Sequence, residues 1–424
     1  MIFLYSFALW LLLPYVFFRL VWRARKQPEY LHHIAERFGF YSVNTHKPII
    51  WLHAVSVGET RAAQTLVARL LVSYPLHQLL ITHTTPTGRA TSAQLYGDKV
   101  LCVYLPYDYP FAVKSFIRHF RPQIGILMET EVWFNLIHAC HKFNTPLILL
   151  NARMSEKSKQ GYARFARLTS NALNTLTAIG AQTADDAKRL IELGAQDVSI
   201  MGNLKFDIEP PQDMLALAKP LREQFGKTRR VFLAASTREG EELLLLDALN
   251  RTPVPNLLLV IVPRHPQRFA DIASLLEQRN LNFQRRSANC AVAAETQVVL
   301  GDSMGEMFAY YAAADIAFIG GSLLPYGGQN LIEACLVGTP VLVGPYTHNF
   351  AEATQLAIRA GAAVMAKDAD EAIMKLQHLL DNPEVLNEMH QQCAKFVNLN
   401  LGATDQSMQI ITDLLSNKPE QFSL

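Results

Sequence analysis

The sequence contains few cysteines, and their spacing is uninformative. No CxxC pair and no spacing typical of a metal site is present among the five residues Cys102, Cys140, Cys290, Cys335 and Cys393. A sparse, odd-numbered set fits free, buried thiols in a reducing compartment. We therefore expect neither a disulfide framework nor a cysteine-ligated zinc site.

Charge is also scarce. Charged residues make up 18% of the 424 residues and the net charge is +2, whereas about 25% is typical of globular proteins. No strong overall field favours nucleic acid, and we expect no nucleic-acid partner. Any anionic ligand has to be bound by local clusters of basic groups.

Several ligand-binding fingerprints are missing. Neither half has GxGxxG after its first expected strand with a ribose-binding acid beyond, and GxxxxGK[ST] does not occur. No carboxylate pair of the DxD type is positioned to hold a metal. The sequence thus argues against a dinucleotide cofactor, a P-loop and a metal centre, and it shows no repeats.

What the chain does have is a long apolar beginning, "MIFLYSFALWLLLPYVFFRLVW" over residues 1–22. Residues 1–18 carry no charge, which is just long enough to cross a bilayer. Basic residues follow the apolar run instead of preceding it, as in a signal-anchor and unlike a cleaved signal peptide: Arg19, Arg23, Arg25 and Lys26. We predict a single transmembrane helix over 1–22, with the body on the cytoplasmic face of the inner membrane; the alternative is a buried N-terminal helix.

Residues 19–40, "RLVWRARKQPEYLHHIAERFGF", mix basic and aromatic side chains. Cations meet lipid phosphates and amphipathic rings sit at the headgroup layer of a bilayer. We therefore expect inner-membrane lipid to be a partner of this segment. A solvated first helix with an aromatic inner side is the alternative.

From residue 48, short apolar runs alternate with helical stretches, and the alternation restarts after Pro210 and Pro211. Such runs predict parallel sheets with both faces buried, and the length favours two domains of roughly 200 residues. The predicted fold class is α/β, with an anchor at 1–22, Rossmann-like domains at 23–208 and 209–395, and a C-terminal helix at 396–424 that packs back toward the first domain.

Ligands of open parallel sheets collect at the carboxyl ends of the strands. In the second half, "IGGSLLPYGGQNLIEA" (319–334) predicts a strand, a glycine-rich loop and a helix that begins near Asn330. Free N–H groups at such a helix start favour an anion, and Glu333 is placed to accept ribose hydroxyls. Asn330 and Glu333 also have the spacing of a capping box, which is the structural alternative.

Two more expected strand ends carry similar chemistry. "VPRHPQR" contains Arg264 and Arg268, and arginine suits phosphate or carboxylate through its fork of donors. "GDSMGEM" contains Ser303 and Glu306. Either arginine could instead be an ordinary surface residue. Together these turns predict a nucleotide site in the second domain.

The first half supplies acids instead. Glu129 and Glu131 end one expected strand, and Lys205 lies near the domain boundary. Glu59 follows "IIWLHAVSVG" at a helix start, where a structural role as a dipole-favoured acid competes with a catalytic one. An acidic first domain and a phosphate-binding second domain suggest a two-domain glycosyltransferase.

The order and spacing of these motifs resemble the bacterial 3-deoxy-D-manno-octulosonic acid (Kdo) transferases of lipopolysaccharide synthesis. The resemblance covers nearly the whole chain and rests on "HAVSVGET", "METEVWFN", "NARMSEKS", "GNLKFD", "VPRHPQRF", "GDSMGEM", "GGSLLPYGGQNLIEA" and "VGPYTHNF". It implies a GT-B fold, in which two Rossmann-like domains face one another across a cleft, CMP-Kdo as donor, lipid IVA as acceptor, and no cofactor.

By the same resemblance, Glu59 is the general base of an inverting displacement that releases CMP, and Glu129 and Lys205 stabilise the transition state. The positions that match CMP-binding residues are Pro263, Arg264, Met304, Gly305, Glu306, Asn330, Leu331, Ile332 and Glu333. The chain departs from the family at Gln329, where histidine is common, and at Phe134, where proline is common. A transferase of the same fold that uses a UDP-sugar, and a non-catalytic membrane-tethered nucleotide-binding scaffold, are the competing interpretations.

Overall fold

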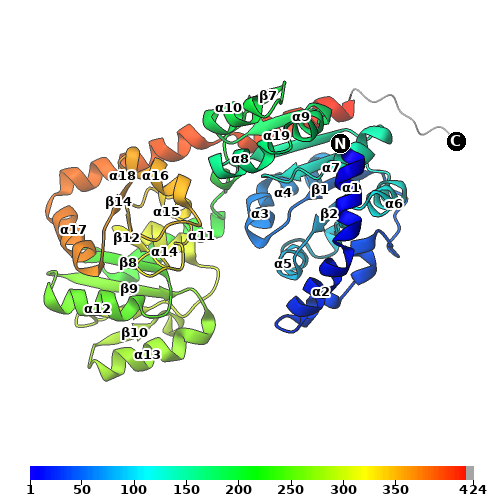
Figure 1. The fold of residues 1–424 in the computed structure, drawn as a ribbon. Coiled ribbons are helices and arrows are strands. Elements are labelled where there is room, and N and C mark those ends of the chain that lie inside the picture. Colours follow the sequence, from blue (N-terminus) through cyan, green and yellow to red (C-terminus); the bar gives the residue numbers. More distant parts are fainter. Residues whose placement is uncertain (417–424) are drawn as a thin grey trace. The chain divides into compact units, whose positions relative to one another are not determined.

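Two compact units make up the chain in this computed structural model, which describes residues 1–416 (Figure 1). The first unit comprises Met1–Asp207 together with the chain from Leu401 onward, and the second comprises Ile208–Asn400. The predicted boundary at 208/209 lies next to the observed one, whereas the predicted boundary at 395/396 falls inside a helix of the second unit.

The first unit contains a seven-stranded parallel sheet in the order β3-β2-β1-β4-β5-β6-β7. Its strands are β1 (Ile49–His53), β2 (Gln78–His83), β3 (Val100–Tyr104), β4 (Ile124–Met128), β5 (Leu147–Ala152), β6 (Ala178–Ala181) and β7 (Val198–Ile200).

Helices cover both faces of this sheet. They are α1 (Ile2–Leu11), α2 (Leu13–Ala24), α3 (Val57–Ala62), α4 (Gln64–Ser73), α5 (Pro86–Tyr96), α6 (Pro110–Phe120), α7 (Phe134–Lys142), α8 (Glu156–Ala163), α9 (Ala166–Thr175), α10 (Ala184–Glu192) and α19 (Ala403–Ser416). The short 3₁₀ helices η1 (Pro28–Leu31), η2 (Ile34–Phe38), η3 (Gly97–Lys99) and η4 (Leu204–Phe206) complete the unit.

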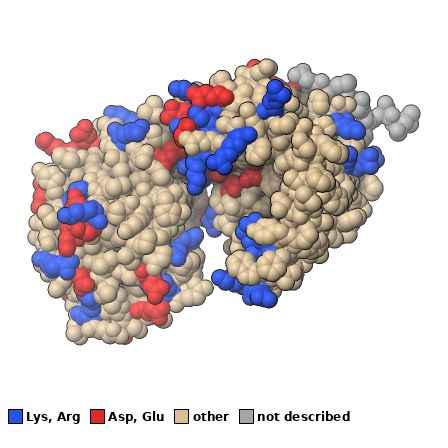
Figure 2. Space-filling view, viewed as in Figure 1, with Lys and Arg blue, Asp and Glu red and all other residues tan. Residues whose placement is uncertain are grey.

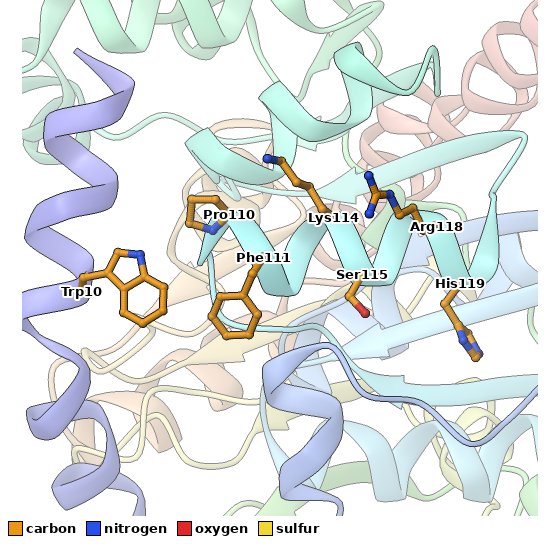
Figure 3. A pocket seen from close by; sticks show the side chains of 7 residues that line it. All are labelled: Trp10, Pro110, Phe111, Lys114, Ser115, Arg118 and His119. Atoms are coloured by element: carbon orange, nitrogen blue, oxygen red, sulfur yellow. The ribbon is translucent and has the colours of Figure 1, made fainter.

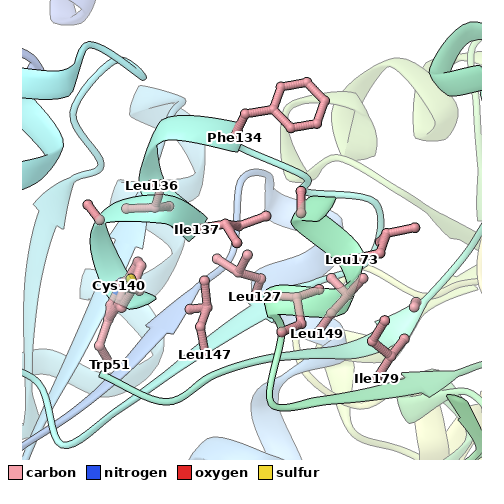
Figure 4. Packing of buried hydrophobic residues seen from close by; sticks show 14 of the residues in the cluster. Trp51, Leu127, Phe134, Leu136, Ile137, Cys140, Leu147, Leu149, Leu173 and Ile179 are labelled. Carbon is pink, nitrogen blue, oxygen red and sulfur yellow. The ribbon is translucent and has the colours of Figure 1, made fainter. Parts of the chain in front are cut away.

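Alternation along β1 divides its side chains between two apolar clusters. Trp51 packs with α6, α7 and α9 on one face (Figure 4), whereas Ile50 and Leu52 pack with α4 and α19 on the other. All five residues of β1 are buried, which explains why the strand is apolar from Ile49 to Leu52 and not alternating in polarity. The core thereby fixes the strand ends where the candidate site residues lie.

The N-terminal apolar segment forms two helices instead of the single predicted one. α1 and α2 meet at Leu12 with a bend of 53°. Within residues 1–416, no single helix is long and apolar enough to span a bilayer. Among these residues, only the bent pair, taken together, has the length and apolar composition of a span. Pro14 lies in the first turn of α2, a position that suits the start of a helix and opposes its continuation from upstream.

One side of α1 is bound to the first unit. The Tyr5 hydroxyl donates to Asp108 Oδ2 at 3.0 Å, and the Ser6 hydroxyl lies 2.9 Å from Asn135 Oδ1. Asp108 in turn accepts the backbone N–H groups of Asn135 and Leu136 at the start of α7. Phe134, one of the two departures from the family pattern, takes part in this contact. Its ring packs edge-on against the Tyr5 ring, with centroids 5.1 Å apart.

The second unit also contains a seven-stranded parallel sheet, in the order β10-β11-β9-β8-β12-β13-β14. Its strands are β8 (Arg230–Thr237), β9 (Leu257–Pro263), β10 (Phe283–Arg285), β11 (Val298–Leu300), β12 (Ile316–Ile319), β13 (Val341–Val343) and β14 (Ala363–Met365). Its helices are α11 (Gln212–Phe225), α12 (Glu241–Arg251), α13 (Phe269–Gln278), α14 (Met307–Ala313), α15 (Ile332–Leu336), α16 (Ala351–Arg359), α17 (Ala369–Asp381) and α18 (Pro383–Asn400), with 3₁₀ helices η5 (Pro266–Arg268) and η6 (Arg286–Ala288).

The chain returns to the first unit after α18. Asp207 binds this returning segment by accepting the backbone N–H groups of Gly402 and Thr404. α19 then packs on α4, where Tyr74 and Thr412 share a hydrogen bond of 2.9 Å. Residues 417–424, the end of the predicted C-terminal helix, lie outside the described residues.

The cysteines differ from the expectation in one respect. All five lie within residues 1–416 and all are free, as predicted, but Cys290 is exposed and Cys102 is half-buried.

Candidate functional site

Glu59 lies in the first turn of α3, at the carboxyl end of β1. Ser56 caps this helix, and its hydroxyl donates to Glu59 Oε1 at 2.8 Å. The backbone N–H of Val55 donates to Glu59 Oε2 at 2.7 Å. The structural role foreseen for this carboxylate is therefore present, and it also fixes the position of the side chain.

Burial gives Glu59 a second property. The residue is 8% exposed, and burial, reinforced by the nearby charge of Glu129, raises its pKa from 4.5 to about 7. The hydrogen bonds from Val55 and Ser56 act in the opposite direction but are outweighed. A carboxyl with a pKa near neutrality can accept a proton efficiently, as a general base must.

Glu129 and Lys205 form an ion pair near Glu59. Lys205 Nζ lies 3.5 Å from Glu129 Oε1, and both side chains are about one quarter exposed. Glu129 directly follows β4 with a left-handed φ of 59°, a conformation that costs a non-glycine residue about 1–3 kcal/mol and often marks functional sites. The first unit thus brings together the three residues predicted to be catalytic.

Glu131 and His53 extend this group, although neither was assigned a role from the sequence. Glu131 Oε2 accepts the Trp133 indole N–H at 2.6 Å and lies 4.0 Å from His53 Nε2. Burial lowers the pKa of His53 to about 3, so the ring is neutral. His53 Nδ1 lies 3.0 Å from the Thr82 carbonyl oxygen and 2.8 Å from the Thr82 hydroxyl, and the buried Nε2 has no hydrogen-bond partner among the described residues.

In the second unit, buried Glu241 supports the glycine-rich loop that follows β12. Its carboxylate accepts the backbone N–H groups of Gly321 at 2.6 Å, Leu323 at 2.9 Å and Arg238 at 2.8 Å. Gly320 is required for close approach, since a Cβ there would collide with the Ser236 carbonyl oxygen. Sequence reasoning missed Glu241 because two of its three donors, Gly321 and Leu323, lie 80 and 82 residues further along the chain.

The Asn330–Glu333 segment differs from its prediction. α15 begins at Ile332 and has five residues, so it is shorter than expected and its dipole is correspondingly weak. Asn330 donates to Glu333 Oε1 at 3.1 Å and accepts the N–H of Ile332 at 3.0 Å. Leu331 and Ile332 are buried in the core, so only their backbone groups are available to a ligand.

Gln329, the other departure from the family, continues this loop. Its backbone N–H donates to the Gly320 carbonyl at 3.0 Å, which any residue but proline would do. The side-chain amide lies beside Gly321.

The Met304–Glu306 turn follows β11. Glu306 accepts the Ser303 hydroxyl at 2.6 Å and pairs with Arg286 at 3.2 Å. Met304 is 62% exposed. Gly305 has a left-handed φ of 82°, and no atom lies within 4 Å of the position that a Cβ would take there. This turn presents backbone and a carboxylate next to the end of β9.

Pro263 ends β9, and the N–H of Arg264 donates to the Thr237 carbonyl at 3.0 Å. The interpretation of Arg268 as an anion-binding side chain is wrong for this structure. Its guanidinium donates to the buried Glu242 through two bonds of 2.7 and 2.9 Å. The Thr237 hydroxyl also donates to Glu242, at 2.6 Å.

β11, β9, β8 and β12 are neighbours in the sheet, so the turns at 263–264, 304–306 and 320–333 meet at one edge. Within residues 1–416, no group of three or more His, Cys, Asp or Glu side chains is arranged to hold a metal ion. The chemistry of this edge is that of exposed backbone, amide and carboxylate groups with an adjacent arginine.

Both halves match known families. Residues 32–208 match the family described as "3-Deoxy-D-manno-octulosonic-acid transferase (kdotransferase)", and residues 227–396 match "Glycosyl transferases group 1".

Individual relatives span nearly the whole chain. It is 40% identical to the 3-deoxy-D-manno-octulosonic acid transferase of Bordetella pertussis over 394 residues, which cover 89% of this chain and 91% of that one. It is 36% identical to the enzyme of the same name from Haemophilus influenzae, with coverages of 92% and 93%. A glycosyltransferase structure from Rickettsia africae shares the fold, with a TM-score of 0.56 at 13% identity, over 88% of this chain and all of that one.

Proposed function

Because the chain belongs to the 3-deoxy-D-manno-octulosonic acid transferase family, we propose that it transfers Kdo from CMP-Kdo to lipid IVA in lipopolysaccharide synthesis and releases CMP. The observation that carries the mechanism is the buried Glu59 carboxylate, whose pKa is about 7.

In the proposed reaction, a hydroxyl oxygen of the acceptor attacks the anomeric carbon of Kdo while the bond from that carbon to the CMP phosphate oxygen breaks. The hydroxyl proton passes to Glu59, and the bonding electrons leave with CMP. A phosphate of low pKa departs without protonation, so one base suffices, and direct displacement inverts the anomeric centre.

Lys205 and Glu129 are proposed to act on charge that develops during this step. An ammonium group fixed beside a carboxylate keeps its position, and the partly exposed Lys205 can stabilise the Kdo carboxylate or the departing phosphate. Glu129 has a further effect, because its charge raises the pKa of Glu59.

CMP is proposed to bind at the strand-end turns of the second unit. Arg264 offers its guanidinium to the phosphate, and the Asn330–Glu333 pair supplies amide and carboxylate groups for the nucleoside. Gly320 and Gly321 lie in the loop that Glu241 holds, and because they have no side chains their backbone can come close to a ligand. The facing of the two domains across a cleft stays a prediction.

We also propose that the enzyme is attached to the cytoplasmic face of the inner membrane through α1 and α2. Large apolar side chains cover the outward sides of both helices, among them Phe3, Phe7, Phe18 and Trp22. A straight single-pass span would need the 53° bend to open and the Tyr5 and Ser6 hydrogen bonds to break. These contacts favour a pair that lies in the interfacial layer.

The test is product identification. Purified protein in detergent is incubated with CMP-Kdo and lipid IVA. The mass of the lipid product is measured by mass spectrometry, and the released CMP is quantified. We expect lipid that has gained Kdo and an equal amount of CMP, with no CMP release when the acceptor is omitted. Transfer from a UDP-sugar, or CMP binding without turnover, would favour one of the two competing functions.

A further inference from the structure

An open groove lies between α1 and α6 on the first unit (Figure 3). Its volume is about 720 Å³, and it is lined by Trp10 from α1 and by Pro110, Phe111, Lys114, Ser115, Arg118 and His119 from α6. None of these residues comes from the segments that carry Glu59, Glu129 or Lys205. The groove is therefore separate from the candidate catalytic residues.

The two cations of the groove are available to an anion. Lys114 and Arg118 lie one helical turn apart and point to the same side of α6 (Figure 3). Among the residues that the structure describes, neither forms an ion pair, and Arg118 stacks on the Phe143 ring at 5.4 Å. A guanidinium and an ammonium at this spacing suit a phosphate group.

The wall of the groove is held in place. Ser115 donates to the Gly39 carbonyl at 2.5 Å, and His119 Nε2 lies 2.7 Å from the Val43 carbonyl. Gly39 packs so closely on α6 that a Cβ there would lie 2.6 Å from the Ala112 carbonyl oxygen. These contacts fix the position of α6, the wall of the groove that carries Lys114 and Arg118.

Apolar surface continues from the groove along α1. Trp10 is 48% exposed and packs against Phe111, with ring centroids 5.6 Å apart and the rings tilted by 31°. Exposed Phe3, Leu4 and Phe7 lie on the same helix. In the space-filling view the surface over α1 carries almost no charge, and Lys and Arg side chains gather where α2 ends (Figure 2). Aromatic rings between an apolar surface and cations are typical of a membrane interface.

We propose that this groove binds the phosphate of an anionic glycerophospholipid headgroup, with Lys114 and Arg118 as its ligands and the exposed side of α1 among the acyl chains. The proposal rests on the membrane attachment proposed above and adds a defined headgroup site to it. The occupant is bulk phospholipid and not the acceptor, because the groove lies along the side of α6, apart from the residues that act on the acceptor.

The test compares the full-length protein with Lys114→Gln/Arg118→Gln and with a control that loses the same charge, Lys219→Gln/Lys395→Gln. Both control lysines are exposed and belong to the second unit. Binding is measured by co-sedimentation with phosphatidylcholine vesicles that contain or lack phosphatidylglycerol. We expect the groove variant to bind phosphatidylglycerol vesicles about 25-fold more weakly, since each of the two basic residues near an anionic surface contributes a factor of about five.

The control should change this affinity by less than about two-fold, and the groove variant should bind pure phosphatidylcholine as the wild type does. Equal losses in the groove and control variants, or no loss in either, would overturn the proposal. Kdo transfer is measured in parallel in non-ionic detergent. A raised KM for lipid IVA in the groove variant would assign the groove to the acceptor and would also overturn it, whereas selective vesicle binding by a protein without transferase activity would refute only the proposed function.

Discussion

At the scale of residues, Glu59 holds its proton more tightly than an ordinary glutamate, because burial and the charge of Glu129 both oppose its ionisation. The sequence pointed to Glu59, Glu129 and Lys205 through their positions after strands and through family resemblance. It could not indicate the raised pKa, which depends on burial, nor the roles of Glu241 and Asp108, because most of their hydrogen-bond donors are distant in sequence.

The pKa of Glu59 predicts a pH dependence for the reaction. As a base it acts when ionised, so kcat should fall as pH drops through about 7. In Glu129→Gln the neighbouring charge is removed, and the acid limb of the kcat profile should shift to lower pH, whatever the change in absolute rate. Glu192→Gln, an exposed glutamate paired with Lys159, is the control; an acid limb that stays in place in Glu129→Gln would contradict the coupling.

The same pKa predicts a cost in stability. Between pH 4.5 and about 7, the folded protein holds a proton on Glu59 that the unfolded chain has released, so this group lowers the free energy of unfolding as pH rises through that window. Glu59→Gln avoids this cost. Denaturant unfolding at pH 8 should show that the Glu59→Gln variant is more stable than the wild type by about 1–3 kcal/mol. At pH 4 the difference should nearly disappear. A variant that is less stable than the wild type at pH 8 would be inconsistent with a raised pKa.

At the scale of elements, most strands could be predicted because buried parallel strands are continuously apolar. β10 was missed, since "FQR" is three residues long and has one apolar side chain. The break between α1 and α2 was also not predicted, because composition is apolar on both sides of it and Pro14 is its main signal in the sequence. The short length of α15 reflects the loop that precedes it, which is fixed by Glu241 and not by local propensity.

The glycine-rich loop gives a prediction at this scale. In Glu241→Gln, an amide replaces a carboxylate that faces three N–H donors, so at least one buried donor loses its acceptor. The free energy of unfolding should fall by about 2–4 kcal/mol, and CMP should bind more weakly in calorimetric titration. Glu239→Gln is the matched control, because Glu239 is exposed two residues earlier; a Glu241→Gln protein with wild-type stability and CMP affinity would show that the loop does not depend on this carboxylate.

At the scale of the whole molecule, each unit has its own parallel sheet, and the candidate residues divide between them. In the first unit, the residues that follow the strands include carboxylic acids and one lysine. In the second unit, the strands are followed by glycine-rich loops, an amide side chain and an arginine. The sequence predicted this division from the restart of the strand–helix alternation after residue 211. The predicted C-terminal helix that packs back toward the first domain corresponds to α19, but the chain returns to the first unit at Leu401 and not at residue 396. The exact point of return depends on contacts made by Asp207, which the sequence does not show.

This division predicts where CMP protects the backbone. Hydrogen exchange of the wild type with and without CMP should show slower exchange in the second unit, at 263–265, 303–306 and 320–333. The turn around Glu129 should exchange at the same rate in both conditions. Protection centred on the strand ends of the first unit would place the nucleotide on the wrong sheet and would reverse the proposed roles.

The central claim is that Glu59 removes the proton from the acceptor hydroxyl, and single-turnover Kdo transfer by Glu59→Gln tests it most directly. Glutamine retains the size of the side chain and one of the two oxygens, which can still accept the Val55 N–H, but it cannot accept the proton. With enzyme in excess over CMP-Kdo at pH 8, we predict a rate lowered by about 10²–10⁴-fold and a CMP affinity within about two-fold of wild type. A transfer rate within ten-fold of wild type would show that another group is the base.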